Sequence, residues 1–434
     1  MTSPGDSFAP GAADTIFALS SGAAPAAIAI VRISGPRADE ALSRLAGTLP
    51  PAREARLVAL RHAGDLLDRA LALRFPGPNS ATGEDVVELQ LHGGRSVVAA
   101  VESALAAMDG MRAAEPGEFT RRAFEHGRID LAEAEGLADL LQAETESQRR
   151  AALALAGGAL SRQVEAWRQR ILSFAAQVEA VLDFGDETDV PDLPASFTDN
   201  VASLLQEMRS WLARAPAERL RDGIRLVVAG PPNSGKSSLI NVLSGREVAI
   251  TSDIAGTTRD VLESPTALAG TPFLLVDTAG LRASEDRIEA IGVARAEASL
   301  ASADLVLWLG DPEAAPDRAR AILVQSKADV AVPDSRYDLA VSATTGLGLD
   351  DLVDMILARA RDLLPVESEV ALHRRHRELL RQAVESLEEM VRSTDPLVQA
   401  ELLRVARASL DRITGRAGVE DVLDLLFGRF CIGK

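Results

Sequence analysis

Residues 224–237 read IRLVVAGPPNSGKS, an apolar run followed by a loop that fits the phosphate-binding pattern GxxxxGK[ST]. The apolar run predicts a buried strand, and residues 236–244 predict a helix, which is the context that this pattern requires. In such loops the glycines let backbone N–H groups turn toward phosphate oxygens, Lys236 neutralises the β and γ phosphates, and Ser237 ligates Mg²⁺. The stretch therefore predicts a P-loop nucleotide-binding domain.

The sequence around this loop indicates three kinds of region. Short apolar runs alternate with helical runs from residue 224 to residue 364, which is typical of a parallel sheet with helices on both faces. Apolar spacings of three and four predict helices over 131–154, 161–182 and 197–213 before it, and over 370–391, 397–414 and 419–427 after it. Strands at 16–19, 26–33 and 85–92 and a helix at 96–108 predict a mixed α/β region near the N-terminus. An α/β domain inserted into one helical domain is the economical explanation, although two separate helical domains fit the pattern equally well.

Length and charge limit the classes of function. At roughly 150 residues per domain, 434 residues suggest about three domains. The 46 basic and 64 acidic residues give a net charge of −18, which argues against a nonspecific nucleic-acid binder. The single cysteine excludes an internal disulfide, and we expect no signal peptide, no membrane span and a cytoplasmic location.

Two further motifs predict that the nucleotide is GTP. Asp277-Thr-Ala-Gly280 follows an apolar strand, so Asp277 is expected to hold Mg²⁺ through water and the Gly280 N–H to contact the γ-phosphate. Ser326-Lys-Ala-Asp329 resembles the guanine motif NKxD with serine in place of asparagine. Asp329 would accept both guanine hydrogens, and the stem of Lys327 would pack along the base. Residues 342–343 match the remaining loop of the guanine pocket.

The usual group that orients the attacking water is missing. Leu281 stands where Ras-type GTPases carry glutamine, so hydrolysis needs another polar group and another positive charge. Glu289 is a candidate, although its local sequence alone is more typical of a solvated helix residue. Thr258, in the polar loop 252–260, is the candidate sensor of the γ-phosphate and Mg²⁺.

Sequence blocks along the whole chain resemble the MnmE (TrmE) family of tRNA-modification GTPases. These blocks are VRISGP (31–36), TGEDVVELQLHGG (82–94), PGEFTRRAF (116–124), GRIDLAEAE (127–135), IAGTTRD (254–260), DTAGLR (277–282) and the terminal CIGK (431–434). The resemblance implies a multidomain α/β plus all-α fold. Its expected parts are an N-terminal folate-binding and dimerisation domain (1–125), a helical domain in two parts (126–218 and 367–434) and an inserted Ras-like GTPase domain (219–366).

The resemblance also implies an activity. Members of this family act with a flavin-dependent partner, MnmG, to add an aminomethyl-type group to C5 of the wobble uridine of certain tRNAs. The carbon donor is a tetrahydrofolate derivative, 5,10-methylene or 5-formyl. The protein is expected to be a homodimer whose GTPase domains dimerise across their nucleotide faces and bind K⁺ where other systems use an arginine finger.

Site residues follow from the motifs together with this resemblance. Expected nucleotide contacts are Asn233, Ser234, Gly235, Lys236, Ser237, Ser238, Ser252, Thr257, Thr258, Asp277, Thr278, Ala279, Gly280, Ser326, Lys327, Asp329, Ser342, Ala343 and Thr344. Ser237 and Thr258 would bind Mg²⁺, and the potassium ligands would be Asn233, Ser252, the Ile254 carbonyl and Thr257. Expected folate contacts are Arg32, Glu88, Arg128 and Lys434. Catalytic roles are expected for Lys236, Thr258, Glu289 as the residue that orients water, and Cys431 near the folate.

Some features depart from the family pattern or leave alternatives open. Residues 20–25 replace the usual PPGRGG, Ala81 replaces a common aromatic, and Ser326 weakens the base motif. A ribosome-assembly GTPase that acts as a binding switch is the alternative function, and it predicts no folate affinity. The run His373-Arg-Arg-His-Arg377 is a candidate phosphate patch for tRNA, although such a run is more often a solvated helix face.

Overall fold

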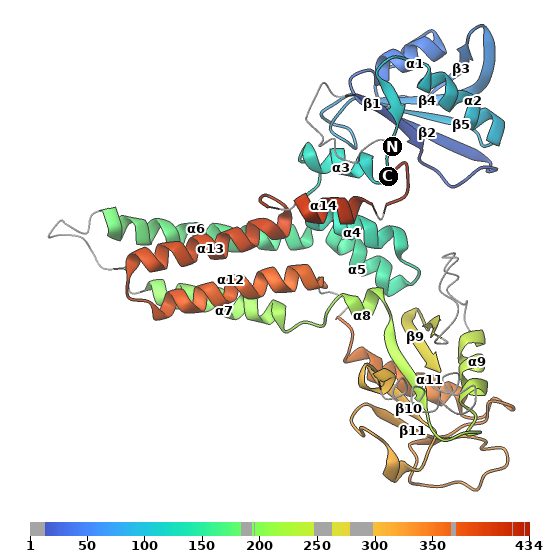
Figure 1. Ribbon diagram of the computed structural model, residues 1–434, viewed down its shortest axis with the longest axis vertical. Helices are drawn as coiled ribbons and strands as arrows, with labels where there is room; N and C mark the ends of the chain where they lie inside the picture. The colour runs from blue at the N-terminus through green and yellow to red at the C-terminus, as the bar shows by residue number, and fades with distance from the viewer. Residues whose placement is uncertain are drawn as a thin grey trace, which may run out of the picture. The chain divides into compact units, whose positions relative to one another are not determined.

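The computed structural model describes residues 14–183, 193–194, 196–246, 263–277, 298–365, 370–418, 420–428 and 430–434. The chain divides into two compact units, the first reaching to Ala138 and including Thr414–Lys434, and the second comprising Asp139–Ile413 (Figure 1). Among the helices in these described ranges, none has the length and apolar character needed to cross a bilayer.

The first unit is built on a six-stranded sheet with the order β3-β4-β5-β2-β1-β6. Its strands are β1 (Thr15–Leu19), β2 (Ile28–Ser34), β3 (Arg56–His62), β4 (Asp65–Phe75), β5 (Val86–His92) and β6 (Met111–Ala113). Neighbours pair antiparallel except β1 and β6, which are parallel. Helices α1 (Ala38–Ala46) and α2 (Arg95–Ala106) pack on one face and share one apolar core with the inward residues of the strands. Strands β3 and β4 and helix α1 were not predicted from the sequence.

The C-terminal segment packs against the N-terminal part of the same unit. Helix α14 (Glu420–Phe427) shares a small core with α3 (Glu118–Glu125) and the start of α4 (Leu131–Gln142). Gly117 has a φ of +70°, and a Cβ there would lie 2.3 Å from the Phe427 carbonyl oxygen. A Cβ at Gly433 would lie 2.2 Å from the Leu19 carbonyl oxygen. Both close approaches exclude any side chain, so the last residues are fitted tightly against α3 and the end of β1.

One part of the second unit consists of long helices, which come from before and after the α/β part in the sequence. They are α5 (Glu146–Ala156), α6 (Ala159–Asp183), α7 (Ser196–Leu212), α12 (Arg374–Arg392) and α13 (Pro396–Thr414), with a short α8 (Glu218–Arg221). The rings of Trp167 on α6 and Trp211 on α7 meet edge to face at 5.3 Å. Helix α7 precedes the α/β part of the chain and packs against α12, which follows it (Figure 1). The α/β part is therefore an insertion within one helical domain, as expected.

The prediction of one helix over 131–154 is wrong. Helix α4 ends at Gln142, and α5 starts at Glu146 behind a complete capping box. The Thr145 hydroxyl accepts a hydrogen bond from the Gln148 N–H, and the Gln148 side chain accepts one from the Thr145 N–H. This reciprocal pair satisfies backbone donors that a continuous helix would have used, so it separates two helices within a single apolar pattern.

The inserted domain contains a second six-stranded sheet with the order β12-β11-β10-β7-β9-β8. Its strands are β7 (Ile224–Ala229), β8 (Glu263–Leu268), β9 (Thr271–Asp277), β10 (Leu305–Trp308), β11 (Ala321–Gln325) and β12 (Leu339–Ala340). All neighbours are parallel except β8, an unpredicted edge strand that forms a hairpin with β9. Helices α9 (Lys236–Arg246) and α11 (Leu349–Arg361) share a core on one face. The other face has its own apolar core, to which Leu300 and Ala303 belong.

Candidate active site

The P-loop lies between β7 and α9, where the sequence predicted it. Gly230 has a φ of +150°, and a Cβ there would lie 2.9 Å from the backbone of Leu309, just after β10. Asn233 and Gly235 also have positive φ values, of 60° and 92°. Glycine is therefore required at position 230, because the loop passes directly over the neighbouring strand.

Lys236 is already held inside this loop. Its side chain is buried, and Nζ donates hydrogen bonds to the carbonyl oxygens of Gly230 at 3.1 Å and Pro231 at 2.8 Å. A buried ammonium needs such partners, because burial without them would be very costly. The positive charge is thus fixed within the loop that the motif assigns to phosphate.

Ser237 and Asp277 come together from two elements. The Ser237 hydroxyl, in the first turn of α9, donates to Asp277 Oδ2 at 2.8 Å, and Asp277 ends β9 with 3% of its surface exposed. Two oxygen atoms at this separation are suitable ligands for a hard divalent cation such as Mg²⁺, either directly or through water. Eight other expected site residues lie outside the described residues: Ser252, Ile254, Thr257, Thr258, Thr278, Ala279, Gly280 and Glu289.

The predicted base motif adjoins the P-loop. A Cβ at Gly235 would lie 3.8 Å from the Ser326 Cβ, so the two loops are in contact range. The Ala328 N–H donates to the Val341 carbonyl at 3.0 Å, which joins the base motif to the loop that begins at Ser342. Lys327 and Asp329 are exposed, as a base-binding surface requires.

The remaining nucleotide-site candidates differ in their surroundings. The buried Ser342 hydroxyl accepts from the Thr345 N–H at 3.2 Å and so shapes its own loop. Ala343 is half-buried, whereas Thr344 and Ser238 are exposed. The Ser234 hydroxyl is buried and has no hydrogen-bond partner in the part of the chain that the structure describes. Asn233 is exposed on the P-loop.

In the first unit, two of the expected folate residues contact each other. Arg32 on β2 and Glu88 on β5 are directly paired in the sheet, and Arg32 Nε and Nη2 donate to Glu88 Oε1 at 3.0 and 2.8 Å. The Arg32 guanidinium also lies 5.7 Å from the centre of the Phe119 ring. Both residues face away from α1 and α2, because their strand neighbours Val31, Ile33, Val87 and Leu89 fill the core on the other side.

The other expected folate residues lie on separate segments. Arg128 is exposed, and its Cγ would lie 3.4 Å from a Cβ at Gly83. Lys434 is half-buried, and its N–H donates to the Cys431 carbonyl at 3.2 Å. Cys431 is exposed rather than packed in a core. Ile432 forms an antiparallel bridge with Pro116, so the terminal CIGK lies beside the start of α3.

Comparison with known proteins agrees with these features. Residues 131–431 match the family described as MnmE helical domain, and residues 15–128 match the GTP-binding protein TrmE N-terminus. The protein named tRNA modification GTPase MnmE from Rhizorhabdus wittichii is 58% identical over 438 residues, covering 100% of this chain and 98% of that protein. The chain belongs to the MnmE family.

A second MnmE relative, from Erythrobacter litoralis, is 57% identical over 423 residues, covering 97% of this chain and all of that protein. Among solved structures, the G domain of the T. maritima FeoB iron transporter is 26% identical, covering 32% of this chain and 98% of that chain, with a TM-score of 0.24. The chain is therefore a tRNA-modification GTPase of the MnmE family. Its P-loop GTPase domain is inserted in the MnmE helical domain.

One buried polar network in the MnmE N-terminal domain was not predicted. Arg122 on α3 donates to both carboxylate oxygens of Glu84 at 3.2 and 3.1 Å and to Glu118 Oε1 at 3.0 Å. The Ser34 hydroxyl donates to Glu84 at 2.7 Å. Burial lowers the pKa of Arg122, but the charges and hydrogen bonds of Glu84 and Glu118 outweigh it and leave that pKa raised. Through these contacts Glu84 and Arg122, which lie in the blocks TGED and EFTRRAF, fix the loop before β5 against α3.

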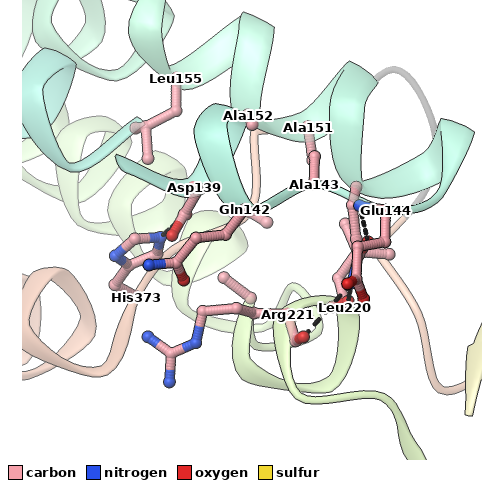
Figure 2. Close-up of a pocket in the computed structure, with 13 residues that line it drawn as sticks. Asp139, Gln142, Ala143, Glu144, Ala151, Ala152, Leu155, Leu220, Arg221 and His373 are labelled. Atoms are coloured by element: carbon pink, nitrogen blue, oxygen red, sulfur yellow. Dashed lines mark hydrogen bonds and ion pairs between the residues drawn. The ribbon is translucent and has the colours of Figure 1, made fainter. Parts of the chain in front are cut away.

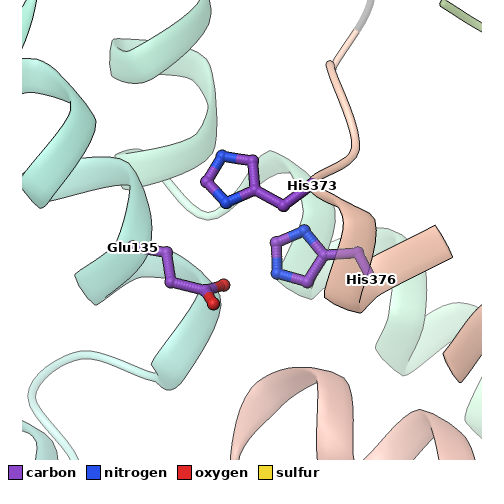
Figure 3. A group of neighbouring side chains, drawn as sticks. All are labelled: Glu135, His373 and His376. Atoms are coloured by element: carbon purple, nitrogen blue, oxygen red, sulfur yellow. The ribbon is translucent and has the colours of Figure 1, made fainter. Parts of the chain in front are cut away.

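The arginine run at the start of α12 has a structural use in this MnmE chain. Arg375 donates to the carbonyls of Arg412 and Ile413 at the end of α13, and Arg377 donates to those of Leu212 and Arg214 at the end of α7. Cationic side chains at helix C-termini satisfy the last carbonyls and oppose the negative end of the helix dipole. His373 and His376 stack at 5.1 Å in the same turn (Figure 3). The tRNA phosphate patch suggested for 373–377 therefore has a competing structural explanation.

Proposed function

We propose that the protein hydrolyses GTP and, with the flavin-dependent partner MnmG, adds an aminomethyl-type group to C5 of the wobble uridine of certain tRNAs. A tetrahydrofolate derivative would supply the carbon. The observation that carries this proposal is the contact between Ser237 and Asp277 beside a P-loop that holds Lys236, in a chain of the MnmE family. Because the two residues are 40 positions apart on different elements, the fold is what brings this pair of oxygen ligands together.

At the nucleotide, each described side chain has a defined task. Lys236 would exchange its bonds to Gly230 and Pro231 for β- and γ-phosphate oxygens, and Ser237 would bind Mg²⁺ directly while Asp277 accepts from a metal-bound water. Bound Mg²⁺ supplies charge neutralisation between the β and γ phosphates. Asp329 would select guanine, and Ser326 would replace the missing amide with one hydroxyl group.

Potassium and Glu289 are proposed to complete the GTPase. Leu281 cannot orient water, and the exposed Asn233 supplies an oxygen donor on the outer side of the P-loop, which suits a hard monovalent cation. Ser252, Ile254 and Thr257 would provide the other ligands when two GTPase domains meet. Glu289 would then hold the attacking water.

The folate derivative is proposed to bind on the sheet face that carries Arg32 and Glu88. The fixed guanidinium suits a carboxylate of the folate, and the Glu88 carboxylate suits the N–H groups of a pterin. Arg128, Lys434 and the exposed thiol of Cys431 would complete this site. Binding of 5-formyltetrahydrofolate to the full chain should weaken strongly in Arg32→Ala but not in Arg74→Ala, because Arg74 pairs with Asp39 elsewhere on the same domain. Equal affinity in both variants would remove the folate assignment.

The same outer sheet face supports the proposed homodimer. Ile28, Leu57 and Leu71 are 57%, 68% and 41% exposed there, whereas their strand neighbours are buried under α1 and α2. Exposed apolar residues gathered on one sheet face are typical of protein interfaces. The first domain would hold the two chains together, and the GTPase domains would associate with each other only during the nucleotide cycle.

The proposal is tested in a strain that lacks the gene. Mass spectrometry of its tRNA should show loss of the C5 modification at the wobble uridine, with recovery when the wild-type chain is supplied but not when Lys236→Ala is supplied. Normal modification in the deletion strain, together with co-sedimentation of the protein with ribosomal particles, would instead favour the ribosome-assembly alternative.

A further inference from the structure

A cavity of about 440 Å³ lies in the second unit, away from the P-loop and from the base motif. Its walls come from the end of α4 and the start of α5, from α8, and from the segment that leads into α12 (Figure 2). The apolar part of the lining includes Ala143, Ala151, Ala152, Leu155, Ala217 and Leu220. Cavities of this size with mostly apolar walls and a few polar groups are typical of small-molecule sites.

The acidic groups of this cavity are incompletely paired. Asp139 Oδ2 contacts His373 Nε2 at 2.7 Å, which leaves Asp139 Oδ1 without a hydrogen-bond partner among the described residues. The Glu144 carboxylate likewise has no hydrogen-bond partner within those ranges, although its N–H donates to Gln148. Asp139 Oδ1 and the exposed Glu144 carboxylate therefore present acceptor oxygens that no described residue uses.

The basic group in the lining is already neutralised. Arg221 Nε and Nη2 donate to the two carboxylate oxygens of Asp222 at 2.9 and 3.3 Å. The hydrogen bond that Arg221 donates to Asp222 raises the pKa of Arg221, and the charges of Asp139 and Glu218 act in the same direction. With this arginine paired, the local charge is negative and complements a cation rather than an anion.

We propose that this cavity binds a small organic cation, an amine or guanidinium joined to an apolar body, through the carboxylates of Asp139 and Glu144. The apolar body would lie against Ala151, Ala152 and Leu155. Gln148 fixes the wall beneath it, because its side chain donates to the carbonyls of Leu220 and Arg221 at 3.0 and 3.3 Å. Since α8 leads into β7, a bound cation would link the α4–α5 turn to the segment that enters the GTPase domain.

Three probes that share one apolar body separate charge from simple hydrophobic binding. Phenethylamine is cationic, 2-phenylethanol is neutral and 3-phenylpropionate is anionic near pH 7. Each is titrated into the full-length protein by isothermal calorimetry and by ligand-observed NMR, without nucleotide or tRNA. We expect saturable binding of phenethylamine, at least roughly tenfold tighter than that of either analogue, which is the effect of one charge-assisted hydrogen bond.

Variants locate the site. Glu144→Gln or Asp139→Asn should weaken phenethylamine binding roughly tenfold, and Ala151→Trp should abolish it by filling the cavity. Two controls on α5 should leave binding unchanged: Glu146→Gln, which carries a carboxylate paired with Arg149 and Arg150, and Leu153→Trp, at an exposed position. Circular dichroism and thermal unfolding confirm that each variant is folded. The proposal is overturned if phenethylamine does not bind, if 3-phenylpropionate binds as tightly, or if folded Ala151→Trp binds like the wild type.

Discussion

At the scale of single residues, the nucleotide site is organised by side chains that also stabilise the fold. Lys236 bonds the carbonyls of its own loop, and Ser237 bonds Asp277 across two elements. In each contact a protein atom bonds the group that would otherwise bind phosphate or Mg²⁺. The loop therefore keeps its shape before nucleotide arrives, and little reorganisation is needed on binding.

Replacing Lys236 tests this arrangement. Lys236→Ala removes the charged donor for phosphate oxygens, and we expect affinity for a fluorescent GDP analogue to fall roughly 100-fold, equivalent to losing two charge-assisted hydrogen bonds. Lys434→Ala is the control, because Lys434 lies in the first unit and is expected to leave nucleotide affinity unchanged. Full affinity in folded Lys236→Ala would contradict the P-loop assignment.

Glu118 predicts a pH dependence for the first unit. Burial raises the pKa of Glu118, but hydrogen bonds from Arg112 and the Glu115 N–H, with the charges of Arg112 and Arg122, outweigh it and hold the pKa below its usual 4.5. A lowered folded-state pKa means that the stabilisation is present above about pH 4.5 and is lost as the pH falls through the folded-state pKa.

Glu118→Gln should therefore lower the free energy of unfolding by about 1–3 kcal/mol at pH 7. This difference should shrink as the pH falls below 4.5 and through the folded-state pKa of Glu118, which is checked by urea unfolding across the pH range. Glu125→Gln removes an exposed pair with Arg121 and should cost less than about 1 kcal/mol at any pH. A pH-independent effect of Glu118→Gln would contradict the ion-pair explanation.

At the scale of elements, one side chain joins two helices of the second unit. The Gln148 carbonyl oxygen accepts from the N–H groups of Glu144 and Thr145 at 2.8 and 2.9 Å, and its amide reaches the end of α8. Beside it, the Ser147 hydroxyl donates to the Gly270 carbonyl at 3.0 Å, in the turn between β8 and β9. The N-terminus of α5 thus contacts both α8 and the β8–β9 turn of the inserted domain.

Removing the Gln148 amide should weaken this connection. For Gln148→Ala we expect a loss of about 1–2 kcal/mol in stability, because the side-chain half of the capping box and the two hydrogen bonds to α8 disappear. Hydrogen exchange should increase at the start of α5 and in α8. Gln169→Ala is a matched control, since Gln169 on α6 makes one exposed hydrogen bond to Glu165. Unchanged exchange in Gln148→Ala would rule out the link.

The arginine run gives a second prediction at this scale. Arg377→Gln should lower stability by about 1 kcal/mol, because the carbonyls at the end of α7 lose their cationic partner. The melting temperature should fall in this variant but not in Arg381→Gln, whose side chain pairs with Glu378 on the surface. Equal melting temperatures would favour the tRNA-contact explanation of the run.

Sequence patterns predicted elements well where a single local rule applies. The P-loop between β7 and α9 follows from one motif, and α6 and α7 follow from helical periodicity. The break between α4 and α5 was missed because the apolar spacing continues through it, and only the Thr145–Gln148 capping box interrupts the helix. The role of Arg375 and Arg377 could not be predicted, since their carbonyl partners lie about 37 or more positions away along the chain.

At the scale of the whole molecule, two distant segments of sequence complete each unit. The terminal CIGK packs beside β1 and α3, and α12 packs against α7 around the inserted domain. The family resemblance predicted this organisation, whereas periodicity alone could not choose between one helical domain and two. Neither approach predicted the cavity beside α5 and α8, because its lining combines residues from three separate stretches of sequence.

The proposed water-orienting residue gives a prediction for catalysis by the whole protein. Glu289→Ala should retain nucleotide affinity while the turnover number for GTP falls about 10²- to 10⁴-fold, the usual contribution of such a group. Single-turnover hydrolysis and equilibrium binding of a GDP analogue separate the two effects. Turnover equal to that of the wild type would assign water positioning to another residue.

The central claim is that the P-loop site is a GTPase made competent by a monovalent cation and not by an arginine. The most direct measurement is phosphate release by the purified full-length chain with Mg²⁺, in KCl and in matched NaCl, with GTP and ATP in parallel. We predict that GTP is cleaved, faster in KCl than in NaCl, and that ATP is not. Failure to bind or cleave GTP in either salt would contradict the nucleotide site, and equal GTP turnover in KCl and NaCl would contradict the potassium-dependent mechanism.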